Sequence, residues 1–397
     1  MTWLPSVRDC QAFPHKEAAQ QFTGQRARIV WQMKIQNNKE VRPRLKVGSI
    51  LAPSLHSTFV GQGDSGLEVS SPARAALSAM DGTSTAQELS QILGIPFSEI
   101  SVLVEELNEA GLIDTEKSKI SVHARFHSAN AKRASHDGDN SNDGAVQQLQ
   151  TKLAPELSST TWLGNVRDGG VDVISRRRDW HVSIFGDSRI ATLLYGILLS
   201  SGVSNTHLKG DDDHKRVGEK DMCAGFLHSS DIGLGFASRT QELSRELSLF
   251  PSARMGSAEN PRKFMVAVGN APADRIQEWM SNGVPHLFID RADCARISIG
   301  PIVIPGQTPC VRCVSMALED QNPMWRDISM RRLLAPDREV PVAVAHHVAG
   351  IAALELLRFI DEGQSQLIGT TARISYHRPT VAQQQSFSRH PACGCNW

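Results

Sequence analysis

The chain has 397 residues, too many for one compact core, so two or three domains are expected. Forty-two Lys and Arg residues balance forty-two Asp and Glu residues, which excludes a strong overall field toward nucleic acid or an anionic membrane. The sequence contains no secretory signal and no continuous run of about 18 apolar residues. We therefore expect a cytoplasmic protein with no membrane partner.

Residues 1–41 have mixed charge and weak helical patterning, and we assign them to an N-terminal extension. Met33 lies just before the first well-patterned segment. Two interpretations of the first 32 residues stay open: an extension without its own fold, or an upstream start that is not part of the natural protein.

Residues 42–120 are predicted to form a small domain. Alternating apolar residues predict strands at residues 44–51, 56–61 and 66–70, with a glycine-rich turn between the last two. Three helices should follow, the first from Ser71, the second after a capping box of Thr85 and Glu88, and the third from Pro96. Three strands and three helices with a tight helix–turn–helix are typical of a winged-helix-like module.

The charge of the third helix argues against DNA binding. It carries Glu99, Glu105, Glu106 and Glu109 and no Lys or Arg, so phosphates would repel it. Peptide binding fits better, because an open edge strand accepts an extended peptide by strand addition, with the third helix as the opposite wall. The residues expected to contact the peptide are Leu67, Val69, Ser70, Ser101, Val104, Glu105 and Asn108. For Val104 a place in the hydrophobic core is the competing interpretation.

Residues 121–160 are predicted to form a flexible linker, because residues 127–144 are rich in Ser, Asn, Asp and Gly. Residues 161–397 alternate between buried strands and helices, which predicts a parallel α/β sheet. The expected elements are strands at 182–185, 206–209, 264–268 and 286–289 and helices at 190–201, 272–282 and 343–360.

A strand, a glycine turn and a helix at residues 182–201 form the place where a nucleotide would bind. Gly186 keeps the tight turn, but Ser188 stands where a second glycine would let the backbone approach phosphate. Asp187 puts a negative charge at the helix N-terminus, where it competes with an anionic nucleotide. We predict a degenerate nucleotide loop and no ATP as cofactor; the alternative is residual nucleotide binding.

Four of the seven cysteines form two close pairs, Cys310 with Cys313 and Cys393 with Cys395. Gly394 allows the tight bend that a Cys-x-Cys pair needs to aim both sulfurs at one metal. Four thiolates favour tetrahedral zinc and leave no open coordination position, so the metal should be structural. A redox pair or four buried thiols are the alternatives, and His390 is expected to be a neighbour of the site rather than a ligand.

The segment 296–313, with Gly300-Pro301, Pro305-Gly306 and Cys310-x-x-Cys313, resembles the GP-x-V-x-PG-x-x-x-C-x-x-C segment of ThiF-like proteins from azole-forming peptide clusters. The closing His390-Pro391-x-Cys393-x-Cys395 is similar to the same family. Together with residues 42–120, which look like a PqqD-like recognition element, the chain resembles the leader-peptide-binding partner of a YcaO cyclodehydratase.

The resemblance implies a non-catalytic partner protein that binds the leader of a ribosomally made precursor and delivers it to the YcaO enzyme for azoline formation, as in bacteriocin and thiopeptide biosynthesis. True adenylating members carry an acidic residue after the third strand, where this sequence reads Val268-Gly269-Asn270. An ATP-dependent adenylyltransferase acting on a peptide carboxylate stays as the alternative, and a zinc-bearing transcriptional regulator is a third. A homodimer is compatible with each.

Overall fold

The computed structural model describes residues 40–70, 73–116, 151–210, 212, 214–249, 261–269, 272–292, 296–335 and 340–395. Their contacts divide the chain into two compact units. The small unit holds the described residues up to Glu116 and also the segment 164–168, and the large unit holds the rest. Residues 1–39 of the predicted N-terminal extension and the polar run at 127–144 lie outside the described residues.

The small unit contains a three-stranded antiparallel sheet in the order β2-β3-β4 and a two-stranded pair, β1-β5. Its elements are β1 (Arg44–Leu45), β2 (Ile50–Pro53), β3 (Ser57–Gln62), β4 (Ser65–Ser70), α2 (Ala73–Ala79), α3 (Ala86–Leu93), α4 (Phe97–Glu109) and β5 (Ile113–Asp114). The predicted strands and helices are present, except that residues 44–51 form two short strands instead of one.

Local sequence explains the helix boundaries of the small unit. Thr85 and Glu88 form the predicted capping box at the start of α3, and Gly94 ends that helix in the left-handed conformation. Leu77, Leu89, Ile100 and Leu107 bring one face of each helix into the core, where each is at most 2% exposed.

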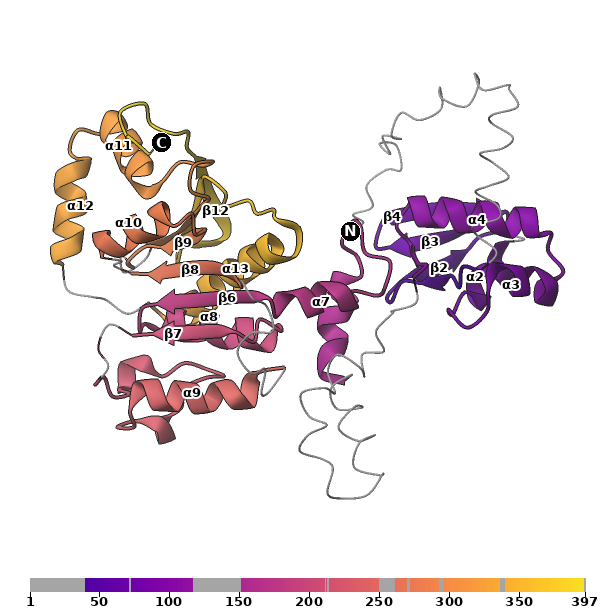
Figure 1. Cartoon of the computed structure of the whole chain (residues 1–397), viewed down its shortest axis with the longest axis horizontal. Coiled ribbons are helices and arrows are strands. Elements are labelled where there is room, and N and C mark those ends of the chain that lie inside the picture. Colours follow the sequence, from indigo (N-terminus) through magenta and orange to yellow (C-terminus); the bar gives the residue numbers. More distant parts are fainter. Residues whose placement is uncertain are drawn as a thin grey trace, which may run out of the picture. The chain divides into compact units, whose positions relative to one another are not determined.

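The large unit is built on a seven-stranded mixed sheet in the order β12-β11-β10-β9-β8-β6-β7 (Figure 1). Its strands are β6 (Trp180–Phe185), β7 (Thr206–Lys209), β8 (Arg262–Val268), β9 (His286–Ile289), β10 (Arg296–Val303), β11 (Thr370–Ser375) and β12 (Arg378–Ser386). Its helices are α7 (Val171–Arg177), α8 (Arg189–Ser200), α9 (Phe236–Leu247), α10 (Ala273–Ser281), α11 (Val311–Gln321), α12 (Trp325–Leu334) and α13 (Val342–Glu362), with 3-10 turns η1 (Glu219–Asp221) and η2 (Ser229–Asp231).

The parallel part of this sheet, β7-β6-β8-β9, confirms the α/β prediction. The expectation of a wholly parallel sheet was wrong, because β10, β11 and β12 pair antiparallel with their neighbours. Residues 151–160, placed in the predicted linker, are helical, and Leu153 there is fully buried.

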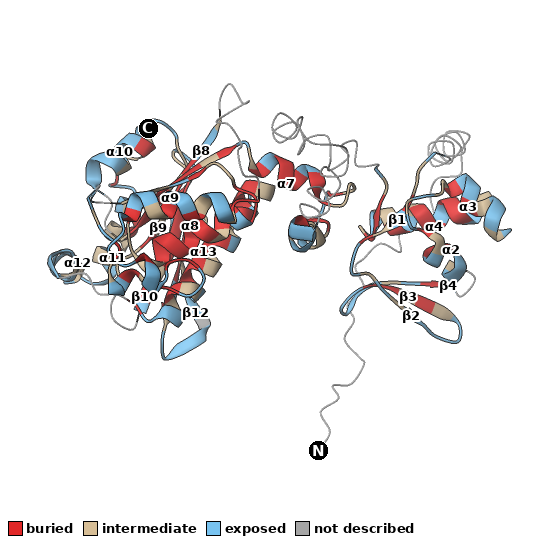
Figure 2. Cartoon of the chain, turned by 90° about the horizontal axis from the view of Figure 1, so that it is seen from below, coloured by how far each residue is buried: buried red, intermediate tan, exposed pale blue. Residues whose placement is uncertain are grey.

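The main core of the large unit lies between the sheet and the helices α8 and α13 (Figure 2). α13 is 21 residues long and apolar enough by length and composition to span a membrane, but half of its apolar window is buried inside the protein. Ala345, Ala349 and Ala352 are fully buried, and α13 packs against α8. This is the behaviour of a core helix.

Candidate functional site: a four-cysteine cluster, a nucleotide-like loop and a free strand edge

The structure brings the four predicted cysteines together, although two of the pairings span more than eighty positions. Cys310 Sγ lies 3.7 Å from Cys313 Sγ and 3.5 Å from Cys393 Sγ, and Cys313 Sγ lies 3.3 Å from Cys395 Sγ. All four sulfurs lie within 4.8 Å of one another. A tetrahedron with Zn–S bonds of about 2.3 Å has sulfur–sulfur edges of about 3.8 Å, so the donor set fits zinc.

Local backbone geometry aims these sulfurs. Cys310 is the N-cap of α11, with φ −81° and ψ 171°, and Cys313 lies in the first turn of that helix. Partial positive charge at a helix N-terminus stabilises thiolates. Gly394 has φ +67°, the left-handed conformation that lets Cys393 and Cys395 face the same point.

The thiols differ in acidity. Burial opposes ionisation of Cys313, but hydrogen bonds from its neighbours outweigh it and lower its pKa to about 7. Burial first, and then hydrogen bonds with the other thiols, raise the pKa of Cys393. Burial, followed by the interactions with Cys313 and Cys310, raises the pKa of Cys395. Protons must therefore be expelled when a metal binds, and four thiolates this close need a cation between them.

His390 supports the cluster from outside it. Its Nε2 lies 3.0 Å from an oxygen of Asp320, and its Nδ1 accepts a hydrogen bond from the backbone N–H of Ala392. Both ring nitrogens are thus occupied, which agrees with the predicted role of a neighbour. The backbone carbonyl of His390 also accepts from the N–H of Cys393, so this residue shapes the second cysteine pair.

The nucleotide-like loop lies at the carboxyl ends of β6 and β8. Gly186 has φ +129°, and a Cβ added there would meet the carbonyl oxygen of Val268 at 2.6 Å, so only glycine fits. Ser188 caps α8, its Oγ accepting from the N–H of Ala191 at 3.5 Å. The turn needed for a nucleotide is retained, and the second glycine is replaced by a capping serine.

Sequence reasoning missed the partner of Asp187. Lys215 Nζ lies 3.2 Å from a carboxylate oxygen of Asp187 and 2.8 Å from one of Asp221, and it donates to the carbonyl of Asp187 at 2.8 Å. The carboxylate of Asp221 is only 2% exposed. The start of α8 therefore already holds an ion-paired carboxylate where an incoming phosphate would be placed.

In the small unit, β4 is the edge strand that the sequence predicted. It pairs with β3 only, and none of the other described residues donates to or accepts from its outer edge. The turn before it has two residues, with Gly63 at φ +62°. Leu67 and Val69 face the helices, with Val69 buried, and Ser70 is exposed.

The predicted residues of α4 are less accessible than those of β4. Ser101 and Val104 are 2% and 1% exposed, so the core interpretation of Val104 describes its place in the structure, and Ser101 shares it. Glu105 and Asn108 are half-buried. Helix α4 therefore offers a peptide fewer accessible side chains than the sequence predicted, because it turns its apolar face into the core.

The segment 164–168 occupies the end of α4. Arg167 Nη2 donates to the carbonyl of Asn108 at 3.0 Å, and Lys46 Nζ donates to the carbonyl of Val166 at 3.1 Å. Lys46 is 2% exposed, and burial lowers its pKa. This segment was assigned to the α/β domain from sequence, whereas its contacts belong to the small unit.

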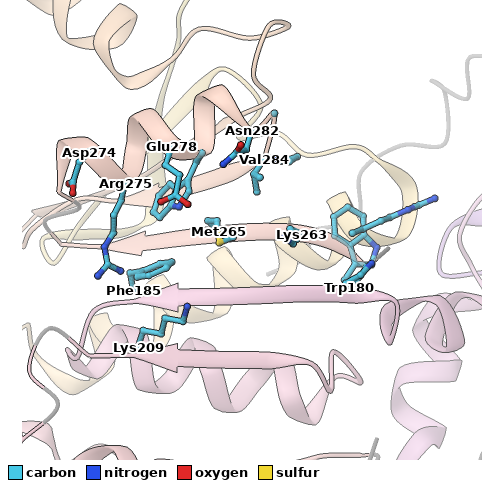
Figure 3. Close-up of a pocket in the computed structure, with 15 residues that line it drawn as sticks. Trp180, Phe185, Lys209, Lys263, Met265, Asp274, Arg275, Glu278, Asn282 and Val284 are labelled. Carbon is cyan, nitrogen blue, oxygen red and sulfur yellow. The ribbon is translucent and has the colours of Figure 1, made fainter. Parts of the chain in front are cut away.

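A groove of about 1020 Å³ lies on the face of the large sheet under α10 (Figure 3). Trp180 and Lys263 line one end, and Phe185, Lys209 and Arg275 line the other. Arg262 also lines the groove and pairs with Trp180 on the neighbouring strand. Nothing in the sequence patterns marked these residues, because they come from three strands and one helix.

No protein-family model and no curated protein matches this chain. Solved structures do: E. coli MccB with AMPCPP and MccA has a TM-score of 0.62 at 14% identity, covering 89% of this chain and 99% of that one. E. coli MccB with ATP gives a TM-score of 0.60 at 14% identity over the same shares. PaaA gives 0.61 at 15% identity, covering 87% of this chain and all of that chain.

The chain has the ThiF-like fold of MccB. At 14–15% identity the likeness establishes this fold over nearly the whole length of both chains. It confirms the predicted fold class, and it does not by itself carry over what MccB binds.

Proposed function

We propose that this chain binds the leader peptide of a ribosomally made precursor at β4 and presents the precursor to a YcaO cyclodehydratase, without itself activating a carboxylate. The observation that carries the proposal is the free, exposed edge of β4 in a small unit whose helix α4 is acidic. MccB, which shares the fold, is a microcin C7 biosynthetic enzyme solved in complex with N-formylated MccA. This likeness supports a role in the processing of ribosomal peptides.

Hairpin geometry identifies the groups that would hold the peptide. Gln62 and Ser65 flank the two-residue turn, so the pairs with Ser65, Leu67 and Val69 are the hydrogen-bonded ones. The N–H and C=O groups of Gly66, Glu68 and Ser70 then point away from β3, toward an incoming strand. Main-chain bonds provide affinity with little dependence on the leader sequence.

The ion pair at the start of α8 supports the non-catalytic part of the proposal. A nucleotide phosphate would have to displace Asp187 from Lys215 or lie beside its negative charge. In this proposal the ThiF-like unit serves as the scaffold that docks on the YcaO enzyme. Azolines would then form there, as Cys, Ser or Thr side chains of the precursor core close onto the backbone with loss of water.

A proline at position 68 tests the strand-addition step. Glu68→Pro removes an outward N–H and leaves the bonds to β3 in place, because only the groups of alternate residues reach β3. We expect fluorescence polarisation with a labelled leader peptide that binds the wild-type chain to show at least about tenfold weaker binding to the variant, or about 1.4 kcal/mol. Glu68→Ala, which keeps the N–H, is the matched control and should bind as the wild type does.

Two results would count against the proposal. Equal leader affinity of Glu68→Pro and Glu68→Ala would exclude addition to β4. Failure of the full chain to increase azoline formation by a YcaO cyclodehydratase on the precursor that carries this leader, measured as water loss by mass spectrometry, would exclude the delivery role.

Adenylation of a peptide carboxylate is the second candidate, because MccB has been solved with ATP and this chain keeps the Gly186 turn. It predicts peptide-dependent exchange of pyrophosphate into ATP by this chain alone. Absence of ATP binding by calorimetry would exclude adenylation and leave the non-catalytic delivery role.

A further inference from the structure

The sheet of the large unit is covered unevenly. Along β6, Val182 and Ile184 face the core with α8 and α13, whereas His181, Ser183 and Phe185 alternate onto the opposite face. Parallel strands are normally buried on both faces. On the opposite face α10 covers part of the sheet, through the contact of Trp279 with Phe185 at 5.2 Å between ring centroids, and the groove opens beside it (Figure 3).

Four cations line this groove without a carboxylate partner among the described residues. Lys209, Arg262, Lys263 and Arg275 are all exposed, and none makes an ion pair within 4.0 Å. Three of them lie over aromatic rings instead. Lys209 Nζ is 5.2 Å and Arg275 Cζ 4.7 Å from the centre of Phe185, and Arg262 Cζ is 5.7 Å from that of Trp180.

The field on this face is positive. His181 and His207 stack with their ring centroids 4.8 Å apart on the same face. Burial lowers the pKa of His181, and Lys209 and Lys263 lower it further. All the charged residues that the strands contribute to the groove are cations. The two acidic residues that line it, Asp274 and Glu278, both come from α10.

The cations are spread along the groove. On the groove face Lys263 pairs with His181 and Lys209 pairs with Phe185, so these two charges are separated by four strand steps. This is about 13 Å at the usual rise per residue, the length of about four residues of extended peptide. Met265 and Val284 place apolar side chains between the two ends (Figure 3).

We infer that this groove binds an extended acidic peptide segment, with carboxylates at both ends and apolar side chains between them. A nucleotide would concentrate its charge on phosphates at one end, whereas here cations lie at both ends of the groove. The inference rests on the proposed function only in taking the peptide to be a precursor segment beyond the part held by β4.

The test uses the full zinc-loaded chain and a fluorescein-labelled peptide with two glutamates at each end and three leucines between them. A second peptide has glutamines in place of the glutamates. We expect the acidic peptide to bind at least tenfold more tightly than the glutamine peptide, with affinity that falls as salt is added. Arg262→Glu with Lys263→Glu should weaken acidic-peptide binding at least tenfold, and Arg326→Glu with Lys152→Glu, an equal charge change outside the groove, should not.

Several outcomes would overturn the inference. One is equal binding of the acidic peptide to both double variants. Another is displacement of that peptide by equimolar ATP, which would make the groove a nucleotide site. A third is a dimer in sedimentation that Arg262→Glu with Lys263→Glu dissociates while no peptide binds, which would make this face an interface between copies.

The failures of the two proposals are distinguishable. If Glu68→Pro still binds the leader, the β4 proposal fails. The groove proposal then still holds if Arg262→Glu with Lys263→Glu loses binding of the acidic peptide. Unchanged acidic-peptide binding by the groove variant removes the groove alone.

Discussion

The carboxylate of Asp187 and the ammonium group of Lys215 lie 3.2 Å apart at the start of α8, on side chains that are 31% and 14% exposed. Lys215 also packs over the ring of Phe236, with its Nζ 4.5 Å from the ring centre. Lys215 is thus held by Asp187, Asp221 and an aromatic ring beside the nucleotide-like loop.

Removing the charge of Asp187 should improve nucleotide binding. We expect Asp187→Asn to bind ATP about fivefold more tightly than the wild type, because about 1 kcal/mol of repulsion at the helix N-terminus is relieved. Isothermal calorimetry measures this change. Asp172→Asn, which removes an exposed carboxylate in the same unit, is the control, and a matching gain there would show that Asp187 has no local effect.

Loss of one cysteine ligand should unfold the large unit. We expect one zinc per chain by elemental analysis, and Cys393→Ser should lose it together with more than about 4 kcal/mol of stability. A metal held by the four thiolates would close a loop of 82 positions between Cys313 and Cys395, so we expect the C-terminal strands to depend on it. Cys223→Ser, at a buried cysteine outside the cluster, should keep the zinc.

The same variant tests the independence of the two units. Leader binding by the small unit should persist in Cys393→Ser and after chelation, since its core contains none of the four ligands. Loss of leader binding under these conditions would show that the small unit needs the folded large unit.

A charge at Val104 should destabilise the small unit rather than merely block a peptide. Val104 is 1% exposed, so Val104→Asp places an unpaired carboxylate in the core and should cost about 3 kcal/mol or more. Val102→Asp is the matched control, because Val102 on the same helix is 42% exposed. Thermal unfolding followed by circular dichroism should show a large loss for Val104→Asp only; a fully stable Val104→Asp protein that has lost leader binding would place Val104 in the peptide groove.

His286 should remain neutral well below pH 6. It is fully buried, its Nδ1 donates to the carbonyl of Val284 at 2.8 Å, and burial lowers its pKa from 6.5 to about 4. The unfolded chain takes up this proton below pH 6.5 and the folded chain does not. Stability from this residue is therefore complete above pH 6.5 and is lost as the pH falls to about 4, by about 3 kcal/mol in all.

The comparison with His286→Gln isolates this effect from acid release of zinc, which both proteins share. The stability difference between wild type and variant should shrink as the pH falls from 7 toward 4.5, measured by urea unfolding. A constant difference, or a His286 NMR resonance that titrates near 6.5, would contradict the assignment.

Much of the fold could be predicted from the sequence, because those elements depend on interactions between residues close together in the chain. The capping box of Thr85 and Glu88, the left-handed Gly94 and the buried strands of the parallel sheet each act within a few residues. The antiparallel strands β10, β11 and β12 were missed. Of these, β12 is an exposed, glutamine-rich strand without apolar alternation. The groove under α10 was missed for a similar reason: its residues share a face only after the strands pair.

The sequence by itself determined the four-cysteine cluster, because spacing, a bend at Gly394 and the chemistry of thiolates need no knowledge of the rest of the chain. Only the tertiary structure decided which charges meet. Arg177 forms a bidentate ion pair with Asp361, 184 positions away, and Lys215 pairs with Asp187, 28 positions away. Such contacts depend on how strands and helices pack, and no local pattern of residue types specifies that packing.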